Sequence, residues 1–561
     1  MQSKNIPLNL EVPPSAVTYS SIAVIWDKPK NRENITGYRV YINGAFTAQT
    51  AENETFYTAE GLSPDTEYTV SVTAVESEAE SEAVTITAKT APSGAVRDVT
   101  KPPYNAAGDG ITLDTAAIQT AIDDCNDNDV VLIPAGYTFL TGALDLKSNM
   151  TLEVNGTLVS STNAADFERA YGESEKYTGG KCEGAVYTEE APKRLVWSRM
   201  EGWEMYCYRS LINIGSLDRE TDYGKYTGYS CENVKICGTG AITGGSATAE
   251  CQSIAGDTTL LAINEMANTG VFYDFEGSPT SADYLKSRIR GRLITVANGK
   301  NIYIKGVTLE NSPSWTLHMI YSKDVTTNGV TFNTSAIRNG DGWDPDSSEN
   351  CALFGCAFNT GDDCVAIKSG KNPEGNIINR PTKNIRIIGC KSRGGLGLAI
   401  GSEMSGGVEG VYVRDCVMSN TRYGIELKAS RERGGYIRDA HFEDCTVDRV
   451  LIHSVDYNSD GVAAEELPVF SDISFENVNI LGYCGYTDEW LDTAVQAEGF
   501  ADGDCVKNIS FKNVTVGTEK NIEQTISMEH CRGMTFENVR QSNGEEPTYS
   551  ASNAKYSIKT Y

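Results

Sequence analysis

The sequence lacks long apolar runs and is short of positive charge. No stretch of eighteen consecutive apolar residues occurs, so no membrane-spanning helix is expected. Lysine and arginine together number 48 against 76 aspartate and glutamate residues, which gives a net charge of −28. Such an acidic chain argues against nucleic acid and anionic membranes as partners. An acidic sugar polymer stays compatible with this charge if cationic side chains line its binding site.

Histidine is scarce, and cysteine follows no metal-binding pattern. Only four histidines are present, and the 15 cysteines form no Cys-x-x-Cys pair, so we expect neither a metal site nor a cofactor. The first residues, 1–5, lack the apolar core of an export signal. The protein therefore either stays inside the cell or has had its signal removed, and both alternatives remain open. No pattern indicates an oligomeric state.

Residues 1–95 are expected to form a small β-sandwich followed by a linker. Segment 21–26 alternates apolar and polar residues like a half-buried strand, and similar segments follow it. The region resembles a fibronectin type III domain, in which Trp26 would be the core tryptophan and Tyr68 a corner residue. On enzymes such modules are usually spacers or cleft walls.

Residues 96–561 are expected to form the second domain, in which a repeat becomes visible from about residue 300. An apolar frame recurs roughly every 23–36 residues, the range typical of solenoids. Five residues after each start stands a small apolar residue, which predicts one interior ladder of an all-β parallel β-helix with coils about 4.8 Å apart. The cysteines in this ladder are expected to act as small buried hydrophobes. The ladder positions are Val307, Val330, Cys356, Cys390, Cys416, Cys445, Val478, Val514 and Val539.

A second family of strands carries chemically active residues. Four aligned segments between 343 and 429 alternate inward apolar residues with outward polar ones. We expect the outward face to contact a ligand. That face carries Asp344, Asp346, Lys368, Glu426 and Lys428.

One column of the same frame holds acidic residues. Asp341 and Asp363 occupy it on successive coils, Leu396 and Tyr423 follow, and Asp362 adjoins Asp363. Crowded carboxylates cannot all ionise cheaply, so one tends to keep its proton. Such a group can supply the acid and the base of glycosidic hydrolysis. Gly-Asp motifs are also ordinary turn chemistry, but their stacking on adjacent coils favours a catalytic site.

The motifs at 311–316, 339–346, 361–370 and 401–407 resemble those of glycoside hydrolase family 28, the polygalacturonases. The resemblance covers residues 98–561 and implies a right-handed parallel β-helix. It also implies inverting hydrolysis of α-linked galacturonic acid in pectic polysaccharides or oligosaccharides, which would be the partner of this chain.

Carried over residue by residue, the resemblance makes Asp362 the general acid. It makes Asp341 and Asp363 the residues that position and activate water, and it makes Lys428 a ligand of a substrate carboxylate. Glu403 belongs to a motif that resembles exo-acting bacterial members, so exo action is expected.

Two positions depart from the family pattern. The family's Gly-His-Gly has Leu396 in place of histidine, and its Arg-Ile-Lys has Glu426 in place of arginine. An outward Glu426 should repel a second uronate, so the neighbouring sugar could be neutral, as in rhamnogalacturonan. Alternatively, Arg393, Arg431 or Arg433 restores the positive charge. The candidate substrate-binding residues are therefore Lys368, Leu396, Glu403, Tyr423, Glu426, Lys428 and Arg433.

Two insertions, near 165–230 and 251–292, are expected to wall a cleft or to pack over the coils. The first is rich in aromatic residues that could stack on sugars. Two other classes of protein compete with the hydrolase: a calcium-dependent polysaccharide lyase on the same solenoid, and a non-catalytic carbohydrate-binding solenoid. The aromatic residues are Trp197, Trp203, Tyr206 and Tyr208.

Overall fold

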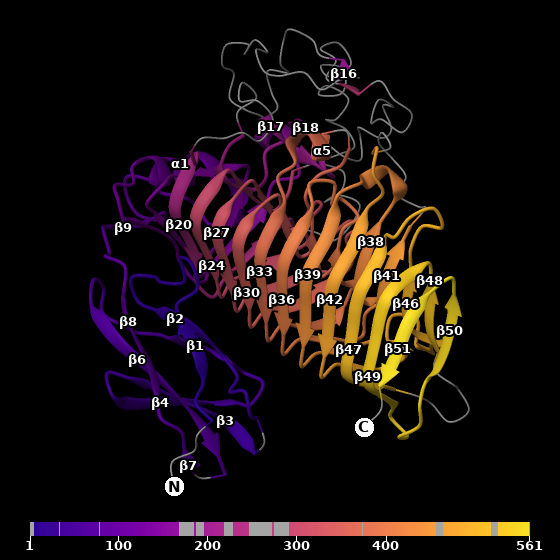
Figure 1. Cartoon of the computed structure of the whole chain (residues 1–561). Helices are drawn as coiled ribbons and strands as arrows, with labels where there is room; N and C mark the ends of the chain where they lie inside the picture. The colour runs from indigo at the N-terminus through magenta and orange to yellow at the C-terminus, as the bar shows by residue number, and fades with distance from the viewer. Residues whose placement is uncertain are drawn as a thin grey trace.

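The chain folds into a small β-sandwich that lies beside a long solenoid (Figure 1). No helix in the described part of the chain is both long enough and apolar enough to cross a membrane. The computed structural model describes residues 5–32, 34–77, 79–167, 185–186, 196–217, 228–245, 272–273, 291–372, 374–455, 464–517 and 525–559.

The N-terminal sandwich has two sheets packed around Trp26. Strands β1, β2 and β5 form one sheet, and β4, β3, β6, β7 and β8 form the other. Trp26 is fully buried and meets Tyr38 edge to face at 5.4 Å between ring centroids. The tryptophan therefore has the core position that was predicted for it. The strands are β1 Leu8–Glu11, β2 Ile22–Asp27, β3 Ile35–Ile42, β4 Ala45–Ala51, β5 Phe56–Ala59, β6 Glu67–Glu76, β7 Ala79–Glu80 and β8 Val84–Lys89.

The solenoid is a parallel β-helix built from two long arrays of strands. Strand β9 opens it by pairing with β11, and helix α1 covers its first coil. The larger array has 25 strands. Its first half is β9 Val96–Asp98, β10 Asp109–Leu113, β11 Val130–Ile133, β12 Thr138–Thr141, β14 Thr151–Val154, β15 Thr157–Ser160, β20 Cys231–Cys237, β21 Ala241–Thr243, β24 Gly299–Lys305, β25 Thr308–Glu310, β27 Lys323–Asn328 and β28 Thr331–Thr334. Its second half is β30 Glu349–Phe354, β31 Ala357–Thr360, β33 Thr382–Ile388, β34 Lys391–Gly394, β36 Val408–Arg414, β37 Val417–Met418, β39 Tyr436–Glu443, β40 Thr446–Val447, β42 Val469–Glu476, β43 Asn479–Ile480, β47 Val506–Val516, β49 Cys531–Gln541 and β51 Lys555–Lys559.

The second array has 12 strands and carries the acidic column on its loops. Its strands are β13 Leu144–Leu146, β19 Ile212–Gly215, β23 Ile294–Ala297, β26 Leu317–Ile320, β29 Trp343–Asp346, β32 Val365–Ile367, β35 Gly397–Ile400, β38 Gly424–Ala429, β41 Val450–Ser454, β46 Thr493–Glu498, β48 Thr525–Glu529 and β50 Thr548–Ser552. Smaller elements are α1 Thr115–Asp123, α5 Glu374–Ile378, the 3-10 turns Ala164–Phe167 and Arg431–Arg433, and the strand pairs β16 Ala185–Val186 with β22 Phe272–Tyr273, β17 Val196–Met200 with β18 Trp203–Cys207, and β44 Tyr483–Cys484 with β45 Glu489–Trp490.

The predicted repeat agrees with the strand register. Ile302 pairs with Val325, Val325 with Cys351, and Cys351 with Ile385, and the later starts pair in the same way. All nine residues of the predicted ladder are at most 5% exposed. The 13 described cysteines are all buried and free of disulfides, as expected of small hydrophobes.

An aromatic ladder, which was not predicted from the repeat in the sequence, lies beside the small-residue ladder. The rings of Phe442, Phe475, Phe511 and Phe536 stack on successive coils with centroids 4.7 to 5.2 Å apart. These residues stand two positions after each repeat start. Offset stacking adds roughly 0.5–1.5 kcal/mol per pair beyond apolar burial, so this ladder helps to hold the C-terminal coils together.

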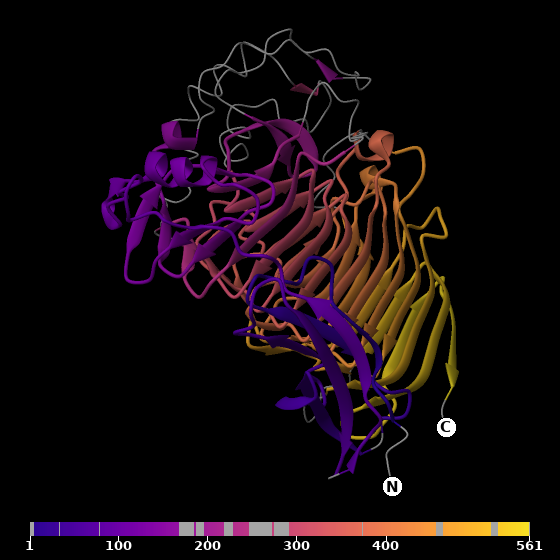
Figure 2. The same ribbon diagram turned by 90° about the vertical axis from the view of Figure 1, so that its left-hand side faces the viewer.

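The sandwich packs on the larger array, along the lower flank of the solenoid (Figures 1 and 2). Phe56 enters the contact and meets Phe354 with centroids 5.8 Å apart. Gly355 and Gly389 leave room for this ring, since a Cβ at either position would fall within 2.8 Å of it. The two glycines therefore permit the close approach of the two domains.

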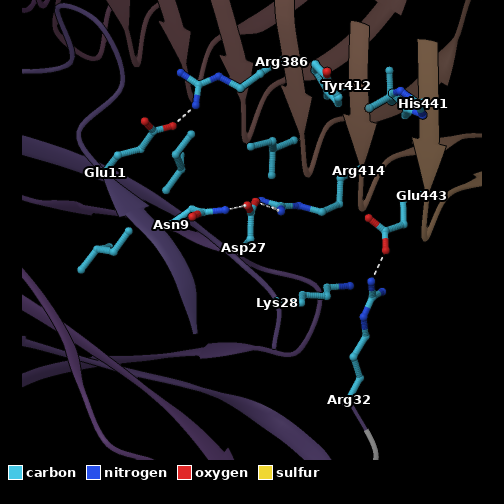
Figure 3. A pocket seen from close by; sticks show the side chains of 14 residues that line it. Asn9, Glu11, Asp27, Lys28, Arg32, Arg386, Tyr412, Arg414, His441 and Glu443 are labelled. Atoms are coloured by element: carbon cyan, nitrogen blue, oxygen red, sulfur yellow. Dashed lines mark hydrogen bonds and ion pairs between the residues drawn. The ribbon is translucent and has the colours of Figure 1, made fainter. Parts of the chain in front are cut away.

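Ion pairs surround this apolar contact (Figure 3). Arg386 pairs with Glu11 and Arg32 with Glu443, each pair joining the sandwich to the solenoid. Arg414 pairs with Asp27 and donates a hydrogen bond of 2.7 Å to the carbonyl oxygen of Trp26. The cavity of about 650 Å³ at this boundary is thus lined by charges that already have partners in the other domain.

We predict that Arg414→Ala weakens domain docking, because it removes an ion pair and a charged donor to a backbone carbonyl. The loss should be about 1.5–3 kcal/mol. Faster tryptic cleavage of the linker after Lys89, with a lower midpoint in urea unfolding, is the expected readout. The control is Arg438→Ala, whose exposed pairing with Glu409 is worth about 0.2–1 kcal/mol. Equal behaviour of the two variants would contradict the docking role.

Candidate active site

The strand register places the acidic residues in one row. Trp343 of β29 pairs with Val365 of β32, which pairs with Leu398 of β35. Asp341 and Asp363 each stand two residues before these partners. They therefore lie on adjacent coils, at the loops that lead into the strands.

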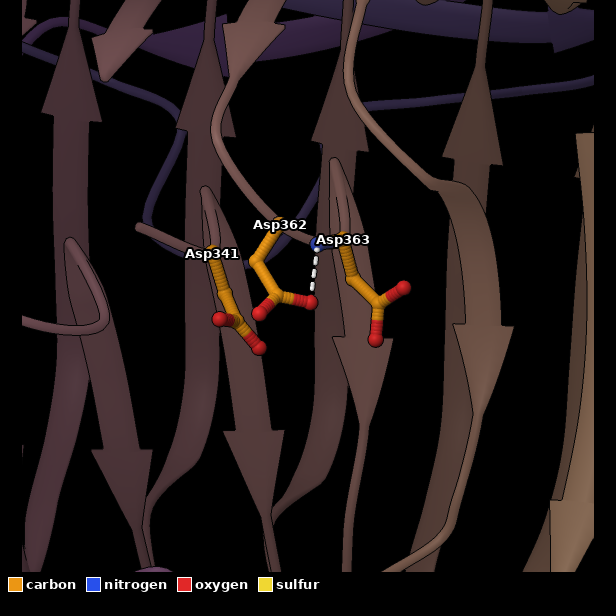
Figure 4. A group of neighbouring side chains, drawn as sticks. All are labelled: Asp341, Asp362 and Asp363. Atoms are coloured by element: carbon orange, nitrogen blue, oxygen red, sulfur yellow. Dashed lines mark hydrogen bonds between the residues drawn. The ribbon is translucent and has the colours of Figure 1, made fainter. Parts of the chain in front are cut away.

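Asp341, Asp362 and Asp363 form a tight group (Figure 4). One carboxylate oxygen from each lies within 4.8 Å of the others. The amide nitrogen of Asp363 donates a hydrogen bond of 3.0 Å to Oδ1 of Asp362. Asp341 and Asp363 are 2% and 3% exposed, whereas Asp362 is half-buried. The group borders a cleft of about 510 Å³, and Asp362 is its most accessible member.

Two buried lysines hold the group from either side. Nζ of Lys368 lies 3.5 Å from Oδ2 of Asp341, and Nζ of Lys428 lies 3.3 Å from Oδ2 of Asp363. The Lys368 ammonium also lies 4.2 Å from the centroid of the Trp315 ring. Each lysine favours the ionised form of the carboxylate beside it.

Burial and mutual repulsion raise the pKa values of this group. Burial, followed by the charge of Asp362, raises the pKa of Asp341 well above its usual range. Burial raises the pKa of Asp363 to about 7, although Lys428 opposes the rise. Near neutral pH the group therefore keeps a proton, which is the requirement for combined acid and base chemistry.

The same three carboxylates could in principle hold a hard divalent cation, because such ions prefer oxygen ligands. The two ammonium groups already supply positive charge at 3.3 and 3.5 Å from the carboxylates. A cation placed here would be repelled by both lysines. The donor set fits proton sharing better than metal binding.

The outward face predicted from alternation is largely covered, although Lys368 and Lys428 still line the cleft. Its five polar residues are between 0% and 6% exposed. The hairpin β17–β18 accounts for part of this cover, because Nη1 of Arg199 lies 2.7 Å from Oδ1 of Asp346 and Arg199 packs 4.5 Å from the Tyr321 ring centroid. The alternation of residues could not predict this cover, because the hairpin comes from a distant insertion.

Glu426 does not face the cleft as an open negative charge, which corrects the expectation that it repels a uronate. It is 3% exposed and lies 2.9 Å from Nζ of Lys428 and 2.9 Å from Nε2 of His453. Burial acts to raise its pKa, but Lys428 and His453 outweigh burial and lower the pKa to about 2. The main reason for expecting a neutral neighbouring sugar therefore disappears.

The other candidate residues are distributed around the same site. Leu396 and Tyr423 line the cleft on the coils after Asp363. Glu403 also lines it, held 3.1 Å from Lys368. Burial acts to raise the pKa of Glu403, but the lysine beside it holds the pKa far below its usual range.

None of the three arginines proposed to restore positive charge lines the cleft. Arg393 is exposed elsewhere, and Arg431 pairs with Asp502 at 2.8 Å. Arg433 is fully buried behind the cleft and donates a hydrogen bond of 3.1 Å to the carbonyl oxygen of Ser402. A role of these arginines in binding substrate therefore stays a prediction.

Four other charged residues line the cleft and were missed. They are Glu201 of the hairpin, Lys371, Arg338 and Arg422. Arg338 precedes Asp341 by three residues, and Arg422 directly precedes Tyr423 of the acidic column. The positions of these two arginines beside the acidic column could have indicated them from the sequence. Glu201 could not be found in this way, because its place in the cleft depends on where the hairpin packs.

The aromatic insertion is mainly packing where the structure describes it. Trp203 and Tyr208 are 1% and 2% exposed, and Nε1 of Trp203 donates a hydrogen bond of 2.9 Å to the carbonyl oxygen of Asn372. Trp197 is half-buried and donates to Glu204 at 3.0 Å. Tyr206 and nearly all of residues 251–292 lie outside the described side chains and segments.

Neighbouring carboxyls that share a proton suit the acid and base chemistry of a glycosidase. Residues 245–482 match the family model described as glycosyl hydrolases family 28, and residues 5–87 match that of the fibronectin type III domain. The chain therefore carries a glycoside hydrolase family 28 domain and, at its N-terminus, a fibronectin type III domain. It is a glycosidase.

Individual relatives share both the length and the fold. An exo-poly-α-D-galacturonosidase of Dickeya chrysanthemi is 25% identical over 95% of this chain and 91% of its own length. The family 28 exopolygalacturonase structure from Yersinia enterocolitica covers 99% of both chains with a TM-score of 0.74 at 21% identity, which shows the fold. A hyperthermoactive exopolygalacturonase from Thermotoga maritima covers 80% of this chain and 92% of its own, with a TM-score of 0.60 at 26% identity.

We predict that Lys428→Met moves the acidic limb of the pH profile of kcat/KM upward by about one pH unit. The Lys428 ammonium lowers the pKa of Asp363, so its loss raises that pKa, and the ionised form then needs a higher pH. Lys428→Arg, which keeps the charge, is the control and should leave the limb in place. An unmoved limb in Lys428→Met would contradict the coupling.

Proposed function

We propose that this glycosidase removes galacturonate units from the end of α-linked galacturonan in pectic polysaccharides or oligosaccharides. The grouping of Asp341, Asp362 and Asp363 between two lysines is the observation that carries the proposal. A relative that matches nearly the full length of this chain is an exo-acting enzyme on such a polymer, which supports the exo assignment. We further infer a sandwich and linker at 1–95 and a catalytic domain at 96–561.

In the proposed mechanism Asp362 is the general acid. It is the most accessible carboxyl of the three and can therefore reach the glycosidic oxygen of a sugar chain in the cleft. Asp341 and Asp363 bind the attacking water and accept its proton as it attacks the anomeric carbon. Lys368 and Lys428 favour the ionised forms of these two bases and so oppose the burial that raises their pKa values.

The stereochemistry of the proposed reaction rests on the family resemblance. The nearest carboxylate oxygens lie within 4.8 Å, which is closer than the separation of about 6.5–9.5 Å common between the carboxyl groups of inverting enzymes. We propose inversion, with water held against the Asp341 and Asp363 pair. Proton NMR of the first-formed product decides the point: a β-anomer supports inversion, and an α-anomer contradicts it.

The hairpin β17–β18 supports action at a chain end. It places Glu201 in the wall of the cleft, and its Gly202 carbonyl oxygen accepts a hydrogen bond of 2.9 Å from the Lys371 amide. A Cβ at Gly202 would fall 2.6 Å from the Lys371 side chain, so this contact is close. The hairpin therefore acts as a fixed wall that a long polymer has to avoid.

We predict that Asp362→Asn lowers kcat on galacturonan by about 10²- to 10⁴-fold, because no acid then protonates the leaving oxygen. Release of reducing ends is the measurement. The matched control is Asp439→Asn, an exposed aspartate on β39 that is remote from the cleft and should keep full activity. Retained activity in Asp362→Asn would contradict the assigned role.

Product analysis on defined oligomers tests the substrate and the mode of action together. Exo action predicts short products from the first minutes, with little early loss of polymer viscosity. Rapid viscosity loss would indicate endo action instead. Faster cleavage of rhamnogalacturonan than of galacturonan would favour a neutral neighbouring sugar, and an unsaturated product absorbing in the ultraviolet would indicate a lyase.

The absence of nucleic acid and membrane partners remains a prediction.

A further inference from the structure

Three of the five cationic side chains that line the cleft are already balanced by carboxylates. Lys368 and Lys371 lie 3.1 and 3.6 Å from the two oxygens of Glu403. Lys428 lies 2.9 Å from Glu426 as well as 3.3 Å from Asp363. These buried lysines therefore offer little uncompensated charge to a polyanionic substrate.

Arg338 and Arg422 are different. Both line the cleft and both are exposed. In the part of the chain that the structure describes, neither guanidinium has a carboxylate partner within ion-pair distance. The Arg422 guanidinium instead lies 5.1 Å from the centroid of the Tyr423 ring, which faces the same cleft. An exposed guanidinium without a counter-ion matches a carboxylate in a two-point geometry.

The two arginines stand at opposite ends of the acidic row. Arg338 precedes Asp341 on the loop into β29. Arg422 precedes Tyr423, which lies two coils beyond Asp363 in the same column, or about 10 Å along the solenoid axis. The row between them holds the catalytic carboxylates and Leu396.

We propose that Arg422, seated on Tyr423, binds the carboxylate of the uronate on that side of the scissile bond, and that Arg338 binds a uronate carboxylate at the other end of the row. Arg422 thereby supplies the positive charge that Leu396 and Glu426 do not. The inference rests on the proposed galacturonan substrate and adds two residues that determine specificity for it. The two arginines also explain how an acidic chain accepts a polyanion. The charge of Glu426 does not prevent this, because Lys428 and His453 already balance it.

Calorimetric binding to an Asp362→Asn background tests the proposal without turnover. In that background, Arg422→Gln should weaken binding of an oligogalacturonate by about 10- to 100-fold, because a charged hydrogen-bonding partner is lost. Binding of the methyl-esterified oligomer should change less than about threefold. Arg422→Lys should recover part of the loss, since it keeps the charge without the fork. Arg431→Gln, which removes an arginine paired outside the cleft with Asp502, is the matched control.

Equal weakening on the acidic and the esterified oligomer would overturn the proposal, because it would indicate a structural role for Arg422. Unchanged binding of the acidic oligomer would overturn it as well. In the parent enzyme, Arg422→Gln should raise KM on oligogalacturonate more than it lowers kcat. If the parent enzyme does not hydrolyse oligogalacturonate at all, the proposed function fails, while the binding comparison still decides the role of Arg422.

Discussion

The stacking of coils at one fixed spacing is the constraint on which the site depends. Because adjacent strands lie about 4.8 Å apart, residues of one column are forced together whatever their charge. Asp341 and Asp363 share such a column, and Asp362 adjoins it. The solenoid thus imposes a carboxylate crowding that a flexible loop would relax. The apolar and aromatic ladders inside the coils hold that spacing rigidly.

The crowding is tolerable because two lysines from the same array of strands balance it. Burying a carboxylate without a partner costs several kcal/mol, and each of these carboxylates would otherwise simply stay protonated. Lys368 and Lys428 keep part of the group ionised, and Glu403 and Glu426 in turn balance the lysines. The result is a chain of alternating charges in which a proton remains available near neutral pH. Removing any one member disturbs its neighbours, so single substitutions here should not add independently.

The repeat and the column could be predicted because both follow from local spacing. An interior ladder leaves a periodic trace in the sequence, and the strand register turns that trace into neighbours in space. His453, a partner of Glu426, was missed although it pairs with Lys428 on the next coil, because the aligned segments ended at residue 429, before that coil. The cover over Asp346 comes from Arg199 in a remote insertion, for which the repeat carries no signal. Contacts within the periodic frame were therefore accessible from sequence, and contacts made by irregular segments were not.

Burial and crowding let one carboxyl of the group keep its proton up to about neutral pH. Difference infrared spectroscopy between acidic and alkaline pH measures it most directly, with Asp363→Asn as the reference. The structure predicts a protonated carboxyl band that disappears near pH 7 in the parent protein and is altered in the variant. Complete ionisation of every aspartate below about pH 5, the range of ordinary carboxyls, would contradict the claim.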